Sequence, residues 1–273
     1  MIRLDRIRHY HLLYHAMGST MLDLVPPDIS PLFAGILIFC SFLTSALTAA
    51  LGLGGGVTLL AIMGLGMPVS SLLPVHGIVQ LGSNLSRSLI QRLYIVWPLA
   101  LWFFIGSVIG IAVGAPIAVW IPDNVAKIAL ALFILWSVFR KRTAPKPVNR
   151  LFFILGGALT SLGTMIVGAT GPMVAGLISS QGLTKQPLIA THALCMVLQH
   201  GLKILAFGLM GFAYHDWLPM LAAMIASGVL GTWLGTRLLD NLPEKLFRTT
   251  FRLTMLILSA QLIWQGVQGL LAH

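Results

Sequence analysis

The sequence predicts an all-α polytopic membrane protein, built from two internally repeated bundles of about four transmembrane helices each. Only 9% of its 273 residues are charged, whereas an average soluble domain carries roughly a quarter. Mean hydropathy is +0.92, and charge-free stretches recur that can hold the roughly 20 apolar residues needed to cross a bilayer. A pattern of glycines and histidines recurs in the two halves. The composition excludes an ordinary soluble enzyme, a disordered chain and a nucleic-acid-binding domain.

The candidate helices follow from the apolar runs in chain order. Most lie in stretches without a single charge, and two reach full length when Lys127 and Lys203 extend toward the bilayer surface from their ends. The predicted helices occupy residues 32–51, 69–91, 95–119, 124–140, 151–167, 185–208, 217–237 and 246–270. Two further apolar pieces, 56–66 and 172–181, are too short to span and are interpreted as re-entrant or broken helices.

Four segments organise the chain. They are a basic tail (1–30), a first transmembrane repeat (31–139), a basic linker (140–150) and a second transmembrane repeat (151–273). The linker holds five basic residues and two prolines, so the positive-inside rule predicts that it lies in the cytoplasm. The tail lacks the uninterrupted apolar stretch of a signal peptide and is interpreted as a second cytoplasmic segment.

An internal duplication is predicted on either side of the linker. A shift of 116 positions aligns Leu51–Arg87 with Val167–Lys203 without a gap and pairs His76 with His192. Two topologies are open. If the short pieces are re-entrant, each half crosses four times and both termini are cytoplasmic. If they count as crossings, each half crosses five times and the halves are inverted. The length of the short pieces favours four crossings.

Two glycine breaks interrupt equivalent apolar runs. Glycine permits backbone conformations that end a helix, and irregular backbone at membrane depth survives only inside protein or beside a wet cavity. Each break precedes a short helix whose N-terminal N–H groups attract anions. The break residues proposed to contact an anion are Gly54, Gly55, Gly56, Thr170 and Gly171. The alternative role of glycine, close helix packing, suits Gly106, Gly110 and Gly114.

The breaks also carry a family resemblance. The first glycine cluster, the Gly66-Met67-Pro68 turn after the short helix, and the second copy around Gly168–Gly182 resemble the sulfite exporter TauE/SafE family, over most of residues 32–270. The resemblance implies a membrane permease of two four-helix repeats, associated with sulfite and related small sulfur-containing anions. Gly171-Pro172 replaces a fuller glycine cluster, and His76 stands where a small hydroxyl residue is commoner. These departures bear on the anion more than on the fold.

Two polar stripes follow the breaks at helical spacing. The first consists of His76, Gln80, Asn84 and Arg87. The second consists of His192, Gln199, His200 and Lys203. Polar groups inside a bilayer normally face the bundle interior or a wet pathway. Imidazole and amide groups would bind anion oxygens, and Arg87 and Lys203 would attract the anion at the pathway mouth. The alternatives are cations that extend to lipid headgroups and histidines that join neighbouring helices.

These features predict a secondary transporter of small anions, with sulfite or related sulfur-containing or organosulfonate anions as substrates. A multi-pass protein of the bacterial cytoplasmic (inner) membrane is expected. The alternatives are a membrane assembly subunit without transport activity and an intramembrane enzyme. All seven acidic residues lie outside the predicted span centres, and neither H-E-x-x-H nor G-x-S-x-G occurs, so no enzyme is expected.

The expected partners are the small anion and the lipid bilayer, and no nucleic acid. No cofactor and no metal site are predicted. Protonation of the paired histidines near neutral pH would offer proton coupling, and assembly into a homo-oligomer is left open. Direction of transport is not predicted.

Overall fold

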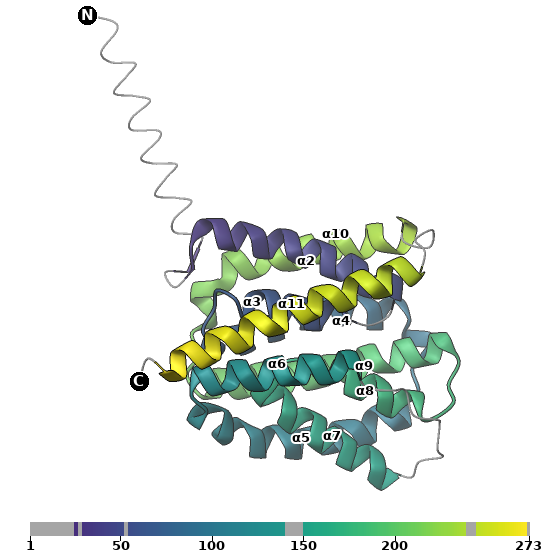
Figure 1. Cartoon of the computed structure of the whole chain (residues 1–273). Helices are drawn as coiled ribbons and strands as arrows, with labels where there is room; N and C mark the ends of the chain where they lie inside the picture. Colours follow the sequence, from purple (N-terminus) through teal and green to yellow (C-terminus); the bar gives the residue numbers. More distant parts are fainter. Residues whose placement is uncertain (1–24, 27–28, 52–53, 140–149, 239–243, 272–273) are drawn as a thin grey trace, which may run out of the picture.

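The computed structural model describes residues 25–26, 29–51, 54–139, 150–238 and 244–271 (Figure 1). Their helices are α2 (Pro31–Leu51), α3 (Gly55–Met63), α4 (Val69–Ile90), α5 (Trp97–Trp120), α6 (Asp123–Phe139), α7 (Arg150–Val167), α8 (Gly171–Ser179), α9 (Lys185–Leu209), α10 (Leu218–Leu238) and α11 (Glu244–Leu271). Short 3₁₀ turns, η1 (Arg92–Tyr94) and η2 (Tyr214–Trp217), precede α5 and α10. No strand occurs in these ranges, so the all-α prediction is confirmed.

Five segments within these ranges are long and apolar enough to cross a bilayer, and they confirm a polytopic membrane protein. They are Pro31–Ala49, Trp97–Trp120, Arg150–Val167, Gln186–Leu209 and Tyr214–Gly235. Helix α4 has 22 residues but a lower hydropathy, because it carries the first polar stripe. The short helices α3 and α8 have nine residues each and follow the two predicted breaks.

Contacts along the chain fix the directions of the first-half helices. Helix α2 begins at one face of the bundle, here called the N-side. The break then turns the chain back, and α3 ends where a side-chain carbon at Gly66 would meet the ring of Phe33, near the start of α2. Helix α4 also begins at the N-side, because the Val69 N–H donates to Asp123 Oδ1 at the start of α6 (2.5 Å). The opposite face, where α4 ends and α7 begins, is called the linker side.

The end of α3 therefore lies close to the start of α2, at the N-side. Four crossings per half, with the short helices re-entrant or broken, and the alternative of five crossings both stay predictions. The cytoplasmic positions of the tail and the linker also stay predictions. Residues 1–24 and 27–28 of the tail and 140–149 of the linker lie outside the described residues.

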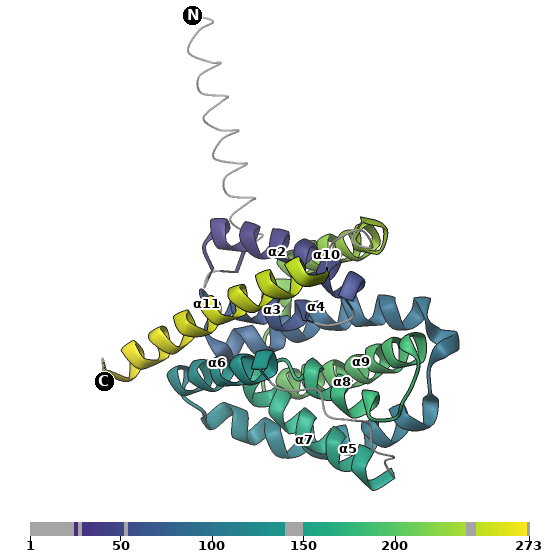
Figure 2. The same ribbon diagram turned by 45° about the vertical axis from the view of Figure 1, so that its right-hand side comes forward.

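The two halves interleave. Helix α2 packs most extensively on α10, and α5 on α7, as both ribbon views show (Figures 1 and 2). A side-chain carbon at Gly231 would meet the backbone of Phe42 and one at Gly235 that of Ala46, so α2 and α10 run in parallel. Ser41 Oγ donates to Met224 O (2.7 Å) and Ser227 Oγ to Ile38 O (2.7 Å) across the same contact. The other large contacts, α4 on α9 and α6 on α11, also join the halves. Each long helix thus takes its main partner from the other half.

Glycines make the parallel pairs possible. A side-chain carbon at Gly110 would overlap the backbone of Ala158 on α7, and one at Gly231 would overlap the backbone of Phe42 on α2. The glycines predicted to serve packing therefore do so. Gly110 and Gly231 align by a shift of 121 positions, and each allows its helix to pack closely against the backbone of a helix from the other half.

Corresponding helices run in opposite directions. The final turns of α11 pack on the first turn of α6, where a side-chain carbon at Gly266 would meet Asn124 and Ile128. Likewise α4 and α9 cross with His76 against His200. The predicted duplication would make the members of each pair equivalent and the two halves inverted. Duplication of the sequence itself stays a prediction.

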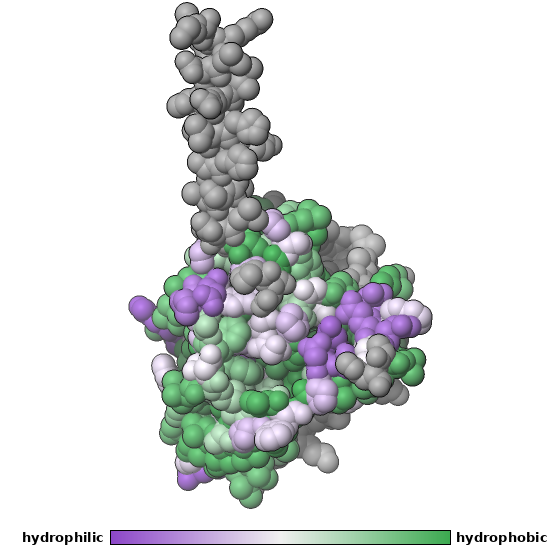
Figure 3. All heavy atoms as spheres, turned by 90° about the vertical axis from the view of Figure 1, so that its left-hand side faces the viewer, coloured by the Kyte–Doolittle hydropathy of each residue, from purple (hydrophilic) through white to green (hydrophobic). Residues whose placement is uncertain are grey.

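Polar and apolar residues divide as a bilayer requires. Figure 3 views the N-side and shows hydrophilic residues gathered on this end face, with hydrophobic residues around the flanks. The N-side carries Asp123 paired with Lys127 (3.2 Å) and Asp216 paired with His215 (2.9 Å). At the linker side Arg150 stacks on Trp102 (5.2 Å). Both faces are therefore polar, and Asp123 and Asp216 lie on the N-side.

Candidate functional site

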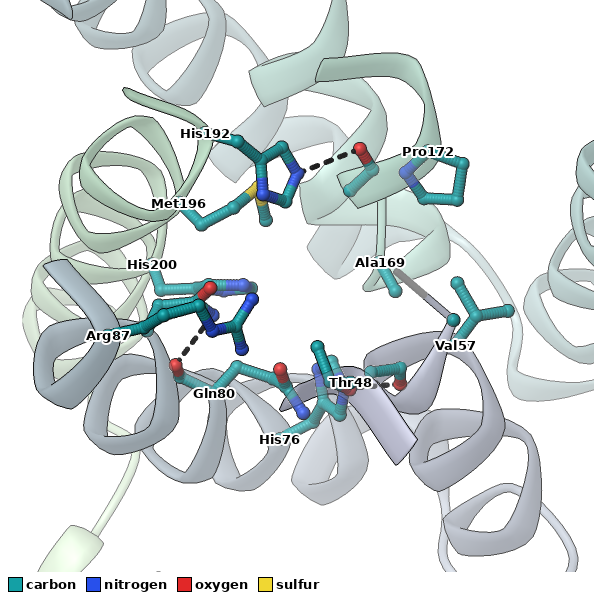
Figure 4. Close-up of a pocket in the computed structure, with 14 residues that line it drawn as sticks. Thr48, Val57, His76, Gln80, Arg87, Ala169, Pro172, His192, Met196 and His200 are labelled. Carbon is teal, nitrogen blue, oxygen red and sulfur yellow. Dashed lines mark hydrogen bonds between the residues drawn. The ribbon is translucent and has the colours of Figure 1, made fainter. Parts of the chain in front are cut away.

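A cavity lies at the centre of the bundle, between the two glycine breaks and the α4–α9 pair (Figure 4). Its volume is about 40 Å³, enough for a few water molecules at roughly 10–15 Å³ each or for one small ion. The lining residues are Thr48, Gly54, Gly56, Val57, His76, Gln80, Asn84, Arg87, Ala169, Gly171, Pro172, His192, Met196 and His200. Nine of these were predicted from the sequence.

The first break is shaped by its backbone. Gly54 has φ +106°, a conformation that residues with a Cβ rarely adopt, and it ends the turn from α2 into α3. Gly55 packs so closely on α2 that a Cβ would overlap the carbonyl of Thr44. It faces α2 and is not among the lining residues of the cavity, so its predicted contact with the anion stays a prediction. Gly56 does line the cavity, beside the Gln80 amide.

The two equivalent histidines hold the starts of the two short helices. His76 Nε2 donates to Gly56 O (2.9 Å), and His192 Nε2 donates to Gly171 O (3.1 Å). In a neutral ring that donates through Nε2, Nδ1 is an acceptor. The expectation that these imidazoles donate to anion oxygens therefore needs correction, because their Nε2–H groups already bind glycine carbonyls. They position the break backbone that lines the cavity.

The two predicted cations have different surroundings. Arg87 lines the cavity, is 6% exposed, and its Nε has no partner in the described structure. Lys203 is fully buried, and its Nζ donates to Gly168 O at the second break (3.1 Å). It does not line the cavity, and its predicted place at a pathway mouth stays a prediction. Gly168 has φ +85°, a conformation that suits glycine, and Lys203 fixes its carbonyl.

Gln199 and Thr170 also support the second break rather than line the cavity. Thr170 Oγ1 donates to Gln199 Oε1 (3.0 Å), and Gln199 Nε2 donates to Ser161 Oγ on α7 (2.9 Å). Both residues are fully buried. Their predicted contact with substrate is therefore replaced by a hydrogen-bond chain that ties α7 and α9 to the break.

Five lining residues were not predicted: Thr48, Val57, Ala169, Pro172 and Met196. Met196 lies four residues after His192 and four before His200, so helical spacing places it on the same stripe. A search restricted to polar residues missed it. Thr48 hydrogen bonds to Thr44 O of its own helix (2.8 Å), and its approach to the breaks depends on how α2 packs.

The electrostatic character of the cavity is positive. Arg87 is the charged residue of its lining, and no carboxylate lines it. The first turns of α3 and α8 face the same space through Gly56 and Gly171, and the N-terminal turn of a helix presents N–H groups without intrahelical partners. Asp123 and Asp216 are at the N-side and have cationic partners there. This arrangement suits a small anion.

Comparison with known proteins agrees with these features. A model of the family described as "Sulfite exporter TauE/SafE" matches residues 36–262. A Haemophilus influenzae (strain Rd) protein described as a "Probable membrane transporter protein" is 26% identical over 242 residues, which cover 84% of this chain and 94% of that protein. No solved structure matches the chain significantly.

Proposed function

The chain belongs to the sulfite exporter TauE/SafE family, and from this premise we propose that it is a secondary transporter of small anions in the bacterial cytoplasmic membrane. The coarser conclusion, a multi-pass membrane transporter, follows from the family and from the transporter-like relative. Both point to transport rather than catalysis. The finer proposal names the cargo as sulfite or a related sulfur-containing or organosulfonate anion.

One observation carries the proposal of an anion: the central cavity contains a guanidinium and two helix N-termini but no carboxylate. A buried cation without a counter-charge is costly, so the site favours a ligand that supplies negative charge. The cavity volume of about 40 Å³ suits a small anion. The family name supports sulfur oxyanions within that class.

The antiparallel packing of α4 on α9 and of α6 on α11 supports transport by alternating access between inverted halves. In transporters with inverted repeats, the substrate site lies at the repeat interface, and the two halves exchange shapes to open it to either face. Here the cavity lies between α4 and α9, which are equivalent helices from the two halves. Each half also contributes one glycine break. The cavity thus lies between the two halves, where a transporter of this kind would bind its substrate.

We propose that the linker side faces the cytoplasm. The linker is rich in basic residues, and Arg150 lies at the same face. Cytoplasmic segments carry an excess of Lys and Arg, whereas the described acids Asp123 and Asp216 are at the N-side. In this orientation the start of α2 lies outside the cytoplasm. Cysteine labelling at the two faces in intact cells tests the assignment.

Uptake by purified protein in proteoliposomes tests the function. We expect accumulation of at least one of labelled sulfite, thiosulfate, sulfate or methanesulfonate, with mutual competition among those that bind. Liposomes containing the Arg87→Met variant serve as the matched control and are expected to show strongly reduced uptake. If none of the four anions enters above the protein-free background, the proposed cargo class is wrong.

A further inference from the structure

Three nitrogen-bearing side chains from α4 and α9 pack together beside the cavity. They are His76, His200 and Lys203, called here the imidazole–ammonium cluster. All three are 1% exposed or less. The rings of His76 and His200 meet edge to face, with centroids 6.0 Å apart. Lys203 Cε lies against Gly77, the residue that follows His76. The cluster joins α4 to α9 at the bundle centre.

Two nitrogen atoms of this cluster are buried without partners. They are His76 Nδ1 and His200 Nδ1. Buried polar atoms in folded proteins are normally hydrogen-bonded, and exceptions call for an explanation. In the ring of His76, Nε2 already donates to Gly56 O. His200 makes no hydrogen bond with any described residue and lines the cavity, so its ring is the freest to change protonation.

The surroundings of the cluster are positive or neutral on every side. Lys203, His76 and His192 all lie close enough to act electrostatically on His200, and Arg87 acts likewise on His192. Helices α3 and α8 contain no ionisable side chain, Arg237 lies in the last turn of α10, and Arg150 of α7 is at the linker side. No described carboxylate faces the cluster. An additional proton there meets repulsion and finds no counter-charge.

An anion in the adjacent cavity reverses this balance. Opposite charges a few ångströms apart attract strongly away from water, so an anion beside Arg87 and His200 stabilises a proton in the cluster. By linkage the effect is reciprocal: a proton in the cluster strengthens binding of the anion by the same factor. Binding of the anion and uptake of a proton are then one coupled event.

We propose that the site takes up its anion together with one proton, and that His200 carries this proton within the imidazole–ammonium cluster. The inference rests on the proposed anion site and names what accompanies the anion. The pair crosses with one negative charge fewer than the anion alone. A monoanion then crosses the site as a neutral pair, and a dianion as a single negative charge.

Calorimetry on the purified full-length protein in detergent tests the proposal. Thiosulfate and methanesulfonate are suitable probes, because they hold no proton themselves near neutral pH. Binding is measured at one pH in buffers with different ionisation enthalpies, and the slope of heat against ionisation enthalpy gives the protons taken up. A single coupled site takes up at most one proton per anion, and we expect a clearly positive slope that approaches one at the pH of greatest uptake, found by repeating the series across neutral pH. Binding with a slope of zero would overturn the proposal while leaving the anion site intact.

Variants locate the proton. His200→Gln removes the titrating group, keeps a polar side chain, and is expected to reduce the slope to near zero while the anion still binds. His200→Asn is the second variant if His200→Gln does not fold. His215→Gln is the matched control, because His215 is exposed and pairs with Asp216 far from the cavity. An undiminished slope in a folded His200 variant would overturn the assignment. If no probe binds to the wild type, the proposed function fails first.

Discussion

The clearest contrast in the site is between its two cations, and replacing each by methionine separates their roles. Arg87 lines the cavity with Nε unpartnered, whereas Lys203 is buried and donates to Gly168 O. Methionine removes the charge and keeps an unbranched side chain of similar length. We expect Arg87→Met to lose anion affinity without losing stability. Lys203→Met is expected to lose stability first.

The size of the first effect follows from the position of Arg87. A hydrogen bond to a charged group contributes about 1.5–3 kcal/mol. Two unit charges 4 Å apart attract by about 4 kcal/mol at the effective dielectric constant of roughly 20 found near protein surfaces. Because Arg87 is 6% exposed, we expect a loss of about 2–4 kcal/mol, or roughly 30- to 1,000-fold in Kd. Without anion, the melting temperature of Arg87→Met should be equal to or higher than that of the wild type, because the substitution removes a buried unpaired charge.

The second effect has a different origin. Lys203→Met leaves the carbonyl of Gly168 with one donor fewer, although Thr164 Oγ1 still donates to it (3.0 Å). Removing one partner of a buried hydrogen bond costs about 1–3 kcal/mol, which should appear as a lower melting temperature without anion. Calorimetric titration with thiosulfate and thermal unfolding of both purified variants measure the two quantities. If Arg87→Met binds within about threefold of the wild type, the anion-binding role of Arg87 is refuted.

Three further predictions concern the scaffold and the breaks. His76→Ala and His192→Ala should each reduce anion uptake at least tenfold in proteoliposomes while the protein stays folded in detergent. Each variant removes the hydrogen bond that holds the start of a short helix. Wild-type uptake in both variants would contradict this. Gly110→Leu should lower the unfolding free energy by more than about 1–3 kcal/mol, the usual cost of overpacking, and a normal melting temperature would show that α5 and α7 can separate freely. Asp123→Ala should cost about 1 kcal/mol in thermal unfolding, since Val69 N–H loses its carboxylate acceptor; Asp216→Ala is the control and should have little effect.

Hydropathy predicted most of the fold because the bilayer leaves few alternatives. The apolar runs predicted the positions of the eight long helices, and the clusters of glycine predicted the two breaks. The pairing of helices could not be obtained in this way. A run such as 97–120 shows that a helix spans, but not which helix it meets. The matched glycines Gly110 and Gly231 were the available sign, since both sit where a helix backbone approaches closely. The two short helices were predicted where the structure has them, after the glycine breaks.

The candidate site was predicted in part for a similar reason. Polar residues within spans identified α4 and α9 as the lining helices, and His76, Arg87 and His192 do surround the cavity. Sequence could not say what each polar group would meet. Lys203 is equivalent to Arg87 in the alignment, yet it turns to a carbonyl of the second break. Met196 lies on the same helix face, but an apolar side chain in a membrane helix gives no indication that it lines a polar cavity.

The interleaving of the two halves has a consequence for biogenesis. Ribosomes deliver α2 to the membrane about 170 residues before α10, its main partner, has been made. During that interval the face of α2 that packs on the α10 glycines is exposed to lipid or contacts other helices. The final helix packing therefore forms only after the last helices insert. A chain cut within the linker should yield two fragments that are each degraded when made alone. Produced together, they should find one another, because every large helix contact lies between them.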